Sequence, residues 1–156
     1  MRIAELTKHN IKDISTLCVD SFLDGEYSYY LQKCNLSGLD NFIDFCSVQN
    51  LESKFDGKHI FLGAFDQNTL IATACVNISI GNILLLFVDK DYQGQGIGKS
   101  LMTEIEKVAK EKSLKRLTVD STHFAVDFYK SCGYTIITNE QILPGGLIFT
   151  TLAKKL

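Results

Sequence analysis

The stretch that decides the fold is LLLFVDKDYQGQGIGKSLM, residues 84–102. It opens as a continuous apolar run, which is typical of a strand covered on both faces, and it closes as the start of an amphipathic helix. Between them lies the glycine-rich turn YQGQGIGKS, residues 92–100. Such a turn predicts a phosphate site, because the first N–H groups of a helix have no acceptor within the helix and attract anions.

Three kinds of phosphate loop compete for this turn, and spacing separates them. A P-loop needs GxxxxGK[ST], but Gln93 stands where its leading glycine must be. A dinucleotide loop needs GxGxxG, and here the third glycine, Gly98, comes one place too early. The pattern [QR]xxGx[GA] of coenzyme A loops fits Gln93, Gly96 and Gly98 without adjustment. We therefore expect a coenzyme A pyrophosphate here, while a plain glycine-rich turn stays open as the alternative for the loop taken alone.

The rest of the chain predicts a layered domain. Hydrophobic periodicity gives one strand, two helices, three strands, a helix, a strand, a helix and two strands. The predicted ranges are 2–6, 11–23, a helix after Ser37, 59–65, 69–79, 82–88, 96–112, 115–120, 123–132, 134–138 and 147–153. This order indicates an α+β, or layered α/β, fold with a mixed sheet, and the length of 156 residues predicts a single domain, 1–156.

Composition excludes several classes of protein. A net charge of −2 argues against a nucleic-acid partner. The longest apolar run, ILLLFV, is too short to cross a bilayer, so we expect a cytoplasmic protein with no membrane partner. The cysteines form no CxxC pair, and the histidines show no ligand spacing, which predicts reduced thiols and no metal site. The cysteines are Cys18, Cys34, Cys46, Cys75 and Cys132.

Two segments resemble the GNAT superfamily of acetyl-CoA-dependent N-acetyltransferases. One is residues 84–102. The other, STHFAVDFYKSCGY at 121–134, is similar to the family's A-x-x-F-Y…K…G-[FY] segment at Ala125, Phe128, Tyr129, Lys130, Gly133 and Tyr134. The predicted strand order is also the GNAT order, whereas residues 1–58 match only in outline. The resemblance implies a mixed, mostly antiparallel sheet of about seven strands flanked by about four helices, splayed between the fourth and fifth strands.

The resemblance also implies acetyl-CoA as cosubstrate, without a metal. Backbone groups of residues 86–88 would pair with the pantetheine arm, and Tyr129 would protonate the departing thiolate. Without the motif, Tyr129 would be interpreted as an aromatic residue of the hydrophobic core. Many family members carry asparagine where this chain has Thr122. The implied coenzyme-binding set is Leu86, Phe87, Val88, Gln93, Gly94, Gln95, Gly96, Ile97, Gly98, Lys99, Ser121, Phe128 and Tyr129.

The resemblance implies direct transfer of the acetyl group to a primary amine, and it leaves the acceptor open. The tyrosine-rich segment 24–35 is expected to face the acceptor through Glu26, Tyr27 and Tyr30. Polyamines, aminoglycosides, lysine side chains and protein amino termini all remain compatible with it, and a homodimer is the default assembly. The general base also stays open among Asp120, His123, Glu26 and a water relay. A covalent route through Cys132, a non-catalytic acyl-CoA-binding module and a nucleotide-binding protein are the alternatives.

Overall fold

The structure is a computed structural model that describes residues 1–25, 36–142 and 146–156. Short 3₁₀ turns lie at Lys8–Asn10 (η1), Lys90–Tyr92 (η2) and His123–Ala125 (η3). Within the described residues, no helix has both the length and the apolar character needed to span a membrane. The strands and helices are β1 (Arg2–Glu5), α1 (Ile11–Gly25), α3 (Leu36–Phe45), α4 (Val48–Ser53), β2 (His59–Asp66), β3 (Thr69–Asn77), β4 (Asn82–Val88), α5 (Ile97–Glu111), β5 (Arg116–Ser121), α6 (Val126–Ser131), β6 (Thr135–Ile142) and β7 (Ile148–Lys155).

The sequence predicted all of these elements except α4. This helix has six residues, which is too short for a helical period to stand out. Ser47 caps it, since the Ser47 hydroxyl accepts a hydrogen bond from the Asn50 N–H at 3.3 Å.

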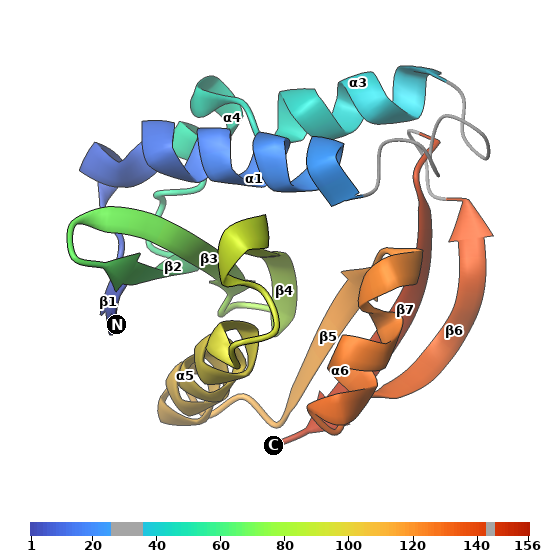
Figure 1. The fold of residues 1–156 in the computed structure, drawn as a ribbon. Helices are drawn as coiled ribbons and strands as arrows, with labels where there is room; N and C mark the ends of the chain where they lie inside the picture. Colours follow the sequence, from blue (N-terminus) through green and yellow to red (C-terminus); the bar gives the residue numbers. More distant parts are fainter. Residues whose placement is uncertain (26–35, 143–145) are drawn as a thin grey trace.

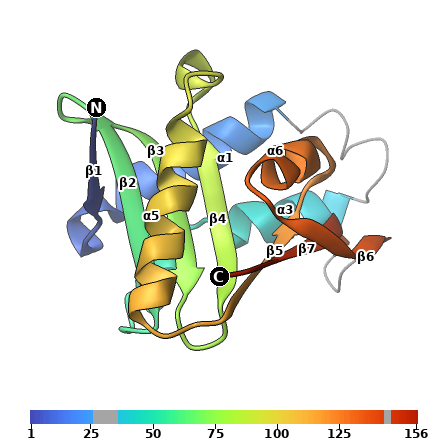
Figure 2. The same cartoon turned by 90° about the horizontal axis from the view of Figure 1, so that it is seen from below.

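The strands form one seven-stranded mixed sheet in the order β1-β2-β3-β4-β5-β7-β6. Every neighbouring pair is antiparallel except β4 and β5, which run parallel. Helices α1, α3 and α4 lie along one side of the sheet, and α5 and α6 lie on the other (Figures 1 and 2). The predicted mixed, mostly antiparallel sheet is therefore confirmed.

Alternation along the strands gives the sheet a hydrophobic core on each side. Phe61 and Cys75 pack toward Phe22 of α1 in the first core, whereas Leu62 and Ala74 belong to the second core, under α5. Consecutive strand residues point to opposite faces, so β2 and β3 serve both cores. The two helix layers are thus held by a shared set of strands.

The sheet is splayed between β4 and β5, as the resemblance implied. Only two residue pairs join these strands, Asn82 with Thr118 and Ile83 with Val119. Beyond this junction the strands diverge (Figure 1). Gly81 closes the junction: its carbonyl accepts a hydrogen bond from the Thr118 N–H at 2.8 Å, and a Cβ atom on it would lie 2.5 Å from the Arg116 carbonyl oxygen.

Candidate active site

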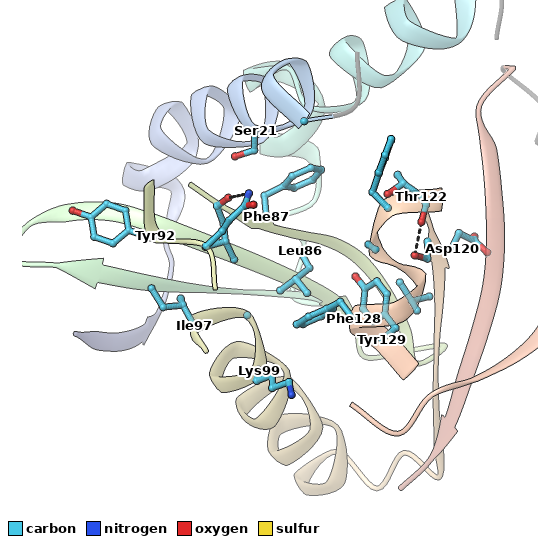
Figure 3. Close-up of a pocket in the computed structure, with 18 of the residues that line it drawn as sticks. Ser21, Leu86, Phe87, Tyr92, Ile97, Lys99, Asp120, Thr122, Phe128 and Tyr129 are labelled. Atoms are coloured by element: carbon cyan, nitrogen blue, oxygen red, sulfur yellow. Dashed lines mark hydrogen bonds between the residues drawn. The ribbon is translucent and has the colours of Figure 1, made fainter. Parts of the chain in front are cut away.

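The diverging strands border a cleft of about 690 Å³ (Figure 3). The glycine loop forms one end of the cleft, the β4 edge one wall, and β5 with α6 the other wall. Almost the whole predicted coenzyme-binding set lines it, namely Leu86, Phe87, Val88, Gln93, Gly94, Gly96, Ile97, Gly98, Lys99, Ser121, Phe128 and Tyr129. Gln95 does not, because its side-chain amide turns back to donate to the Asp91 carbonyl at 3.3 Å. The predicted acceptor residues Glu26, Tyr27 and Tyr30 lie outside the described residues.

The loop presents a row of backbone N–H groups. Among the described residues, no acceptor receives a hydrogen bond from the amides of Gly94 through Lys99, and the first hydrogen bond of α5 runs from the Ser100 N–H to the Gly96 carbonyl at 3.0 Å. Gly94 and Gly96 have φ angles of 73° and 82°, a region that only glycine enters without strain. These free donors at the start of a 15-residue helix form an anion site.

Side chains outside the row of amides hold the loop in this shape. The Gln93 side-chain amide donates to the Val88 carbonyl at 3.0 Å, which ties the loop to the end of β4. The Tyr92 hydroxyl donates to the Asp66 carboxylate at 3.0 Å, which ties it to the β2–β3 hairpin. Because Gln93 occupies the Val88 carbonyl, the β4 groups left for an extended ligand belong to the residues before it.

A close contact brings α5 against α6. A Cβ atom on Gly98 would lie 3.1 Å from the Phe128 ring, so the absence of a side chain lets the ring rest on the first turn of α5. Phe128 in turn meets Tyr129 edge-on, with ring centroids 5.2 Å apart. The two sequence motifs therefore touch each other.

Tyr129 is 4% exposed, yet it lines the cleft from α6. Its ring packs edge-on to Tyr134 at 5.9 Å, and its carbonyl accepts the Tyr134 N–H at 3.1 Å. A phenol held by packing on a short helix keeps one orientation. Tyr129 thus combines a core position with access to the cleft, so the two roles considered from the sequence are compatible.

The candidate bases and the candidate nucleophile differ in whether they line the cleft. Asp120 lines the cleft, whereas His123 lies outside it and faces Glu140, with 3.6 Å between Nδ1 and Oε2. Cys132 does not line the cleft, and burial raises the pKa of its thiol, which disfavours the nucleophilic thiolate. In the described part of the chain, no group of three or more histidine, cysteine or acidic residues is arranged to hold a metal.

Sequence reasoning did not identify four residues that line the cleft from other elements. They are Ser21 and Gly25 at the end of α1, Phe42 from α3 and Phe149 from β7. These residues belong to no motif, and they meet only through the tertiary fold. Two charged residues line the cleft among the described residues, Lys99 in the glycine loop and Asp120 on β5. The cleft is thus cationic at its loop end and anionic on the β5 wall.

The chain matches one protein-family model, described as an acetyltransferase (GNAT) domain, over residues 30–156. A "putative acetyltransferase" of Bacillus subtilis (strain 168) is 28% identical over 116 residues, which is 73% of each protein.

Solved structures share the fold. The PaiA N-acetyltransferase from Thermoplasma acidophilum, crystallised with coenzyme A, has a TM-score of 0.80 at 20% identity and matches 99% of this chain and 98% of its own. The aminoglycoside 6'-N-acetyltransferase from Enterococcus faecium has a TM-score of 0.70 at 17% identity, and it matches 99% and 97% of the two chains.

Proposed function

The chain belongs to the GNAT acetyltransferase family, and from this premise we propose that it transfers the acetyl group of acetyl-CoA directly to a primary amine. One observation supports the proposal most: the row of free amides from Gly94 to Lys99, the open edge of β4 and the Tyr129 side chain line a single cleft. An alternative function, binding of an acyl-CoA without turnover, would need the amides and the strand edge but not Tyr129.

The residues suit the coenzyme at two places. The loop amides and Lys99 would bind the pyrophosphate, since they offer several N–H donors, a helix N-terminus and a positive charge together. Among the described residues, the edge of β4 beyond Ile83 has no strand partner on the β5 side, so it can pair with the amide groups of an extended pantetheine arm. Acetyl-CoA supplies the acetyl group as a thioester.

The reaction then needs little from the protein beyond placement and one proton. The acceptor nitrogen attacks the thioester carbonyl carbon, a C–N bond forms and the C–S bond breaks. Tyr129 donates its hydroxyl proton to the departing sulfur, and the proton lost by the nitrogen passes to water. The Tyr129 phenolate then takes a proton back from water, which restores the general acid. The cleft residues hold the two reactants at bonding distance, which lowers the entropic part of the barrier.

Replacing Tyr129 by phenylalanine tests this role. We expect kcat to fall about 100-fold or more, because a positioned general acid contributes roughly 10²–10⁴ in rate. The dissociation constant for coenzyme A should stay within about twofold, since the ring and its packing remain. Thiol release from acetyl-CoA would be followed with 2-phenylethylamine, putrescine, kanamycin and a lysine-containing peptide as acceptors.

Tyr134→Phe provides the matched control. It removes a hydroxyl from a neighbouring tyrosine that is 2% exposed and does not line the cleft. Unchanged turnover in Tyr129→Phe, under conditions where chemistry limits the rate, would refute the proposed acid. Tight binding of acetyl-CoA with no turnover of any amine would favour the non-catalytic alternative.

The identity of the acceptor cannot be inferred from the solved structures that share the fold. Their names include an aminoglycoside 6'-acetyltransferase and a ribosomal-protein-S18-alanine N-acetyltransferase. The same fold therefore occurs in enzymes named for very different acceptors, and the acceptor has to be argued from the cleft of this chain.

A further inference from the structure

The carboxylate on the β5 wall has a defined partner. Asp120 and Thr151 are directly opposite each other in the β5–β7 ladder, and the Thr151 hydroxyl donates to Asp120 Oδ1 at 2.7 Å. No basic side chain among the described residues pairs with Asp120. Within the residues that the structure describes, Asp120 is therefore an oriented carboxylate without a counter-ion, and the other charged residue lining the cleft, Lys99, belongs to the coenzyme loop.

The strand geometry aims Asp120 away from the core. Val119 and Ser121, on either side of it, are buried, and Asp120 is exposed. Because side chains alternate along a strand, Thr151 and Phe149 on β7 share one face with Asp120. Phe149 lines the cleft as well. This face of the β5–β7 ladder thus presents a carboxylate, the hydroxyl that holds it and an aromatic ring.

The opposite wall of the cleft is aromatic. Phe42 of α3 stacks on Phe22 of α1 with ring centroids 4.0 Å apart, and it meets Phe87 of β4 at 5.8 Å. Phe42 and Phe87 both line the cleft. Figure 3 shows Phe87 on β4 and Tyr129 on α6 in the space between the splayed strands, and Asp120 on β5 at the side of β7. Because Asp120 lines the same cleft as the Phe42, Phe87 and Phe149 rings, the cleft offers a negative charge together with aromatic rings, which is the environment that an ammonium ion prefers.

The geometry of Asp120 suits the binding of a cation. The hydrogen bond from Thr151 orients the carboxylate, and Asp120 is exposed where it lines the cleft. A carboxylate held in this way can attract and orient a cationic substrate.

We propose that Asp120, positioned by Thr151, binds the ammonium group of the acceptor, and that the acceptor carries apolar or aromatic carbons beside that nitrogen. The inference rests on the proposed function, because the acetyl group must reach this nitrogen from the coenzyme side. Asp120 then selects amines that are protonated in solution, and the bound amine loses its proton to water before it attacks.

Coenzyme A thioethers test the assignment without knowledge of the acceptor. S-(2-aminoethyl)-coenzyme A and S-(3-aminopropyl)-coenzyme A place an ammonium group beyond the sulfur, and S-propyl- and S-butyl-coenzyme A are their neutral counterparts of equal length. By isothermal titration calorimetry, we expect the wild-type protein to bind the cationic member of at least one pair about tenfold more tightly. Asp120→Asn should reduce that ratio to about twofold or less, because it keeps the shape and the Thr151 hydrogen bond but loses the charge.

Three further variants separate charge from fold. Thr151→Val should lower the preference part of the way, and Thr151→Ser, which keeps a hydroxyl, should retain it. Asp127→Asn removes a carboxylate from α6 whose side chain is 95% exposed and lies outside the cleft, so it should keep the wild-type ratio. Melting temperatures within a few degrees of wild type would show that each variant is folded.

The outcomes distinguish this inference from the function on which it rests. Equal binding of cationic and neutral thioethers by the wild-type protein, or an unchanged preference in Asp120→Asn, would overturn the role of Asp120 and leave the coenzyme site standing. Failure of all four thioethers to bind would overturn the proposed coenzyme site, and the inference with it.

Discussion

At the scale of single residues, the glycine loop makes its anion site almost entirely from backbone. Gly94 and Gly96 adopt φ angles that favour glycine, Gln93 ties the loop to β4, and the N–H groups up to Lys99 stay free. Side-chain chemistry enters through Lys99, which lines the same end of the cleft. Its charge acts on a site that the backbone has already formed.

Because the backbone forms the anion site and Lys99 only adds a charge, Lys99→Gln should weaken coenzyme binding moderately. We expect the dissociation constant for coenzyme A to rise about 3- to 10-fold, since one exposed charge near a pyrophosphate contributes on the order of 1 kcal/mol. The loss should shrink as salt is raised from about 0.05 M to 0.5 M, because added ions screen the wild-type interaction. Lys110→Gln, in the last turn of the same helix, is the control and should leave affinity unchanged. A salt-independent effect would contradict the electrostatic reason.

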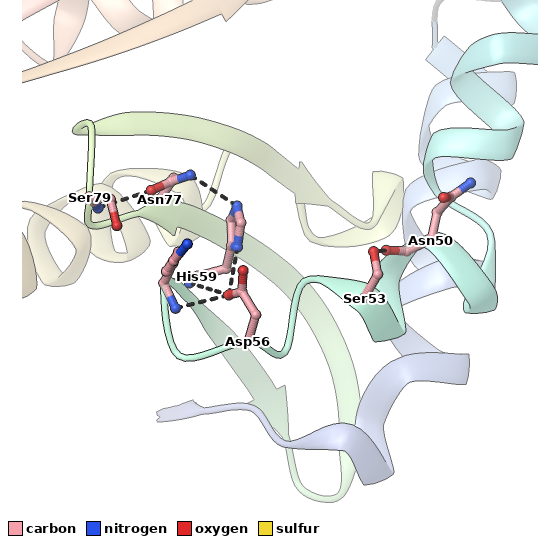
Figure 4. A network of polar contacts seen from close by, with 7 residues as sticks. Asn50, Ser53, Asp56, His59, Asn77 and Ser79 are labelled. Atoms are coloured by element: carbon pink, nitrogen blue, oxygen red, sulfur yellow. Dashed lines mark hydrogen bonds and ion pairs between the residues drawn. The ribbon is translucent and has the colours of Figure 1, made fainter.

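A second residue-scale feature is a polar network at the start of β2 (Figure 4). Asp56 Oδ1 lies 2.9 Å from the His59 Nδ1 and accepts the backbone N–H groups of Lys58 and His59. Asn77 fixes the other side of the ring: its Oδ1 accepts the Ser79 N–H at 2.9 Å, which turns its amide nitrogen toward His59 Nε2 at 3.2 Å. The hydrogen bond with His59, followed by the one from Lys58, lowers the pKa of Asp56 from 3.8 to about 2.

The lowered pKa gives a pH dependence of defined sign. A carboxyl whose pKa is lower in the folded state stabilises the fold above its unfolded pKa of 3.8, and this contribution is lost as pH falls toward 2. We therefore expect the urea midpoint of the wild type to exceed that of Asp56→Asn at pH 5, with the difference shrinking between pH 4 and pH 2. A difference that stayed constant over this range would show that Asp56 does not act through its charge.

At the scale of elements, the short β4–β5 junction depends on Gly81. Gly81→Ala should destabilise the protein by about 2–4 kcal/mol, because the residue has a φ of 70° and its new Cβ would lie 2.5 Å from a backbone oxygen. Gly57 supplies the control, with a φ of 79° and no atom within 4 Å of a built Cβ. Gly57→Ala should cost only about 1 kcal/mol. Urea unfolding would measure both, and equal losses would show that the close approach at the junction is unimportant.

Some elements could be predicted from the sequence and others could not. The glycine loop and the strand before it were predicted because their signals are local: an apolar run, a glycine spacing and a helix start all lie within 84–102. Helix α4 was missed because six residues carry too little periodicity. The partnership of Asp120 and Thr151 joins residues 31 apart, and it follows only from the register of β5 on β7. Asp120 could be named from the sequence as a candidate base, but neither its partner nor the aromatic wall opposite could.

At the scale of the whole molecule, the two hydrophobic cores share strands β2, β3 and β4. We propose that residues 1–156 therefore behave as one domain. Thermal unfolding should show a single cooperative transition, with the same midpoint by far-ultraviolet circular dichroism and by tyrosine fluorescence. Two separated transitions would mean that the two cores melt independently of each other.

The splay between β4 and β5 has one more consequence, for the exchange of amide hydrogens with solvent. In β3 the amides are held in ladders on both sides, so their hydrogens exchange only when the molecule opens. The amides on the outer edge of β4 beyond Ile83 have no strand partner in the described part of the chain, so we expect their hydrogens to exchange from the folded state without global opening. A ligand lying along this edge would slow exchange there first, and deuterium uptake would map its course along the strand residue by residue.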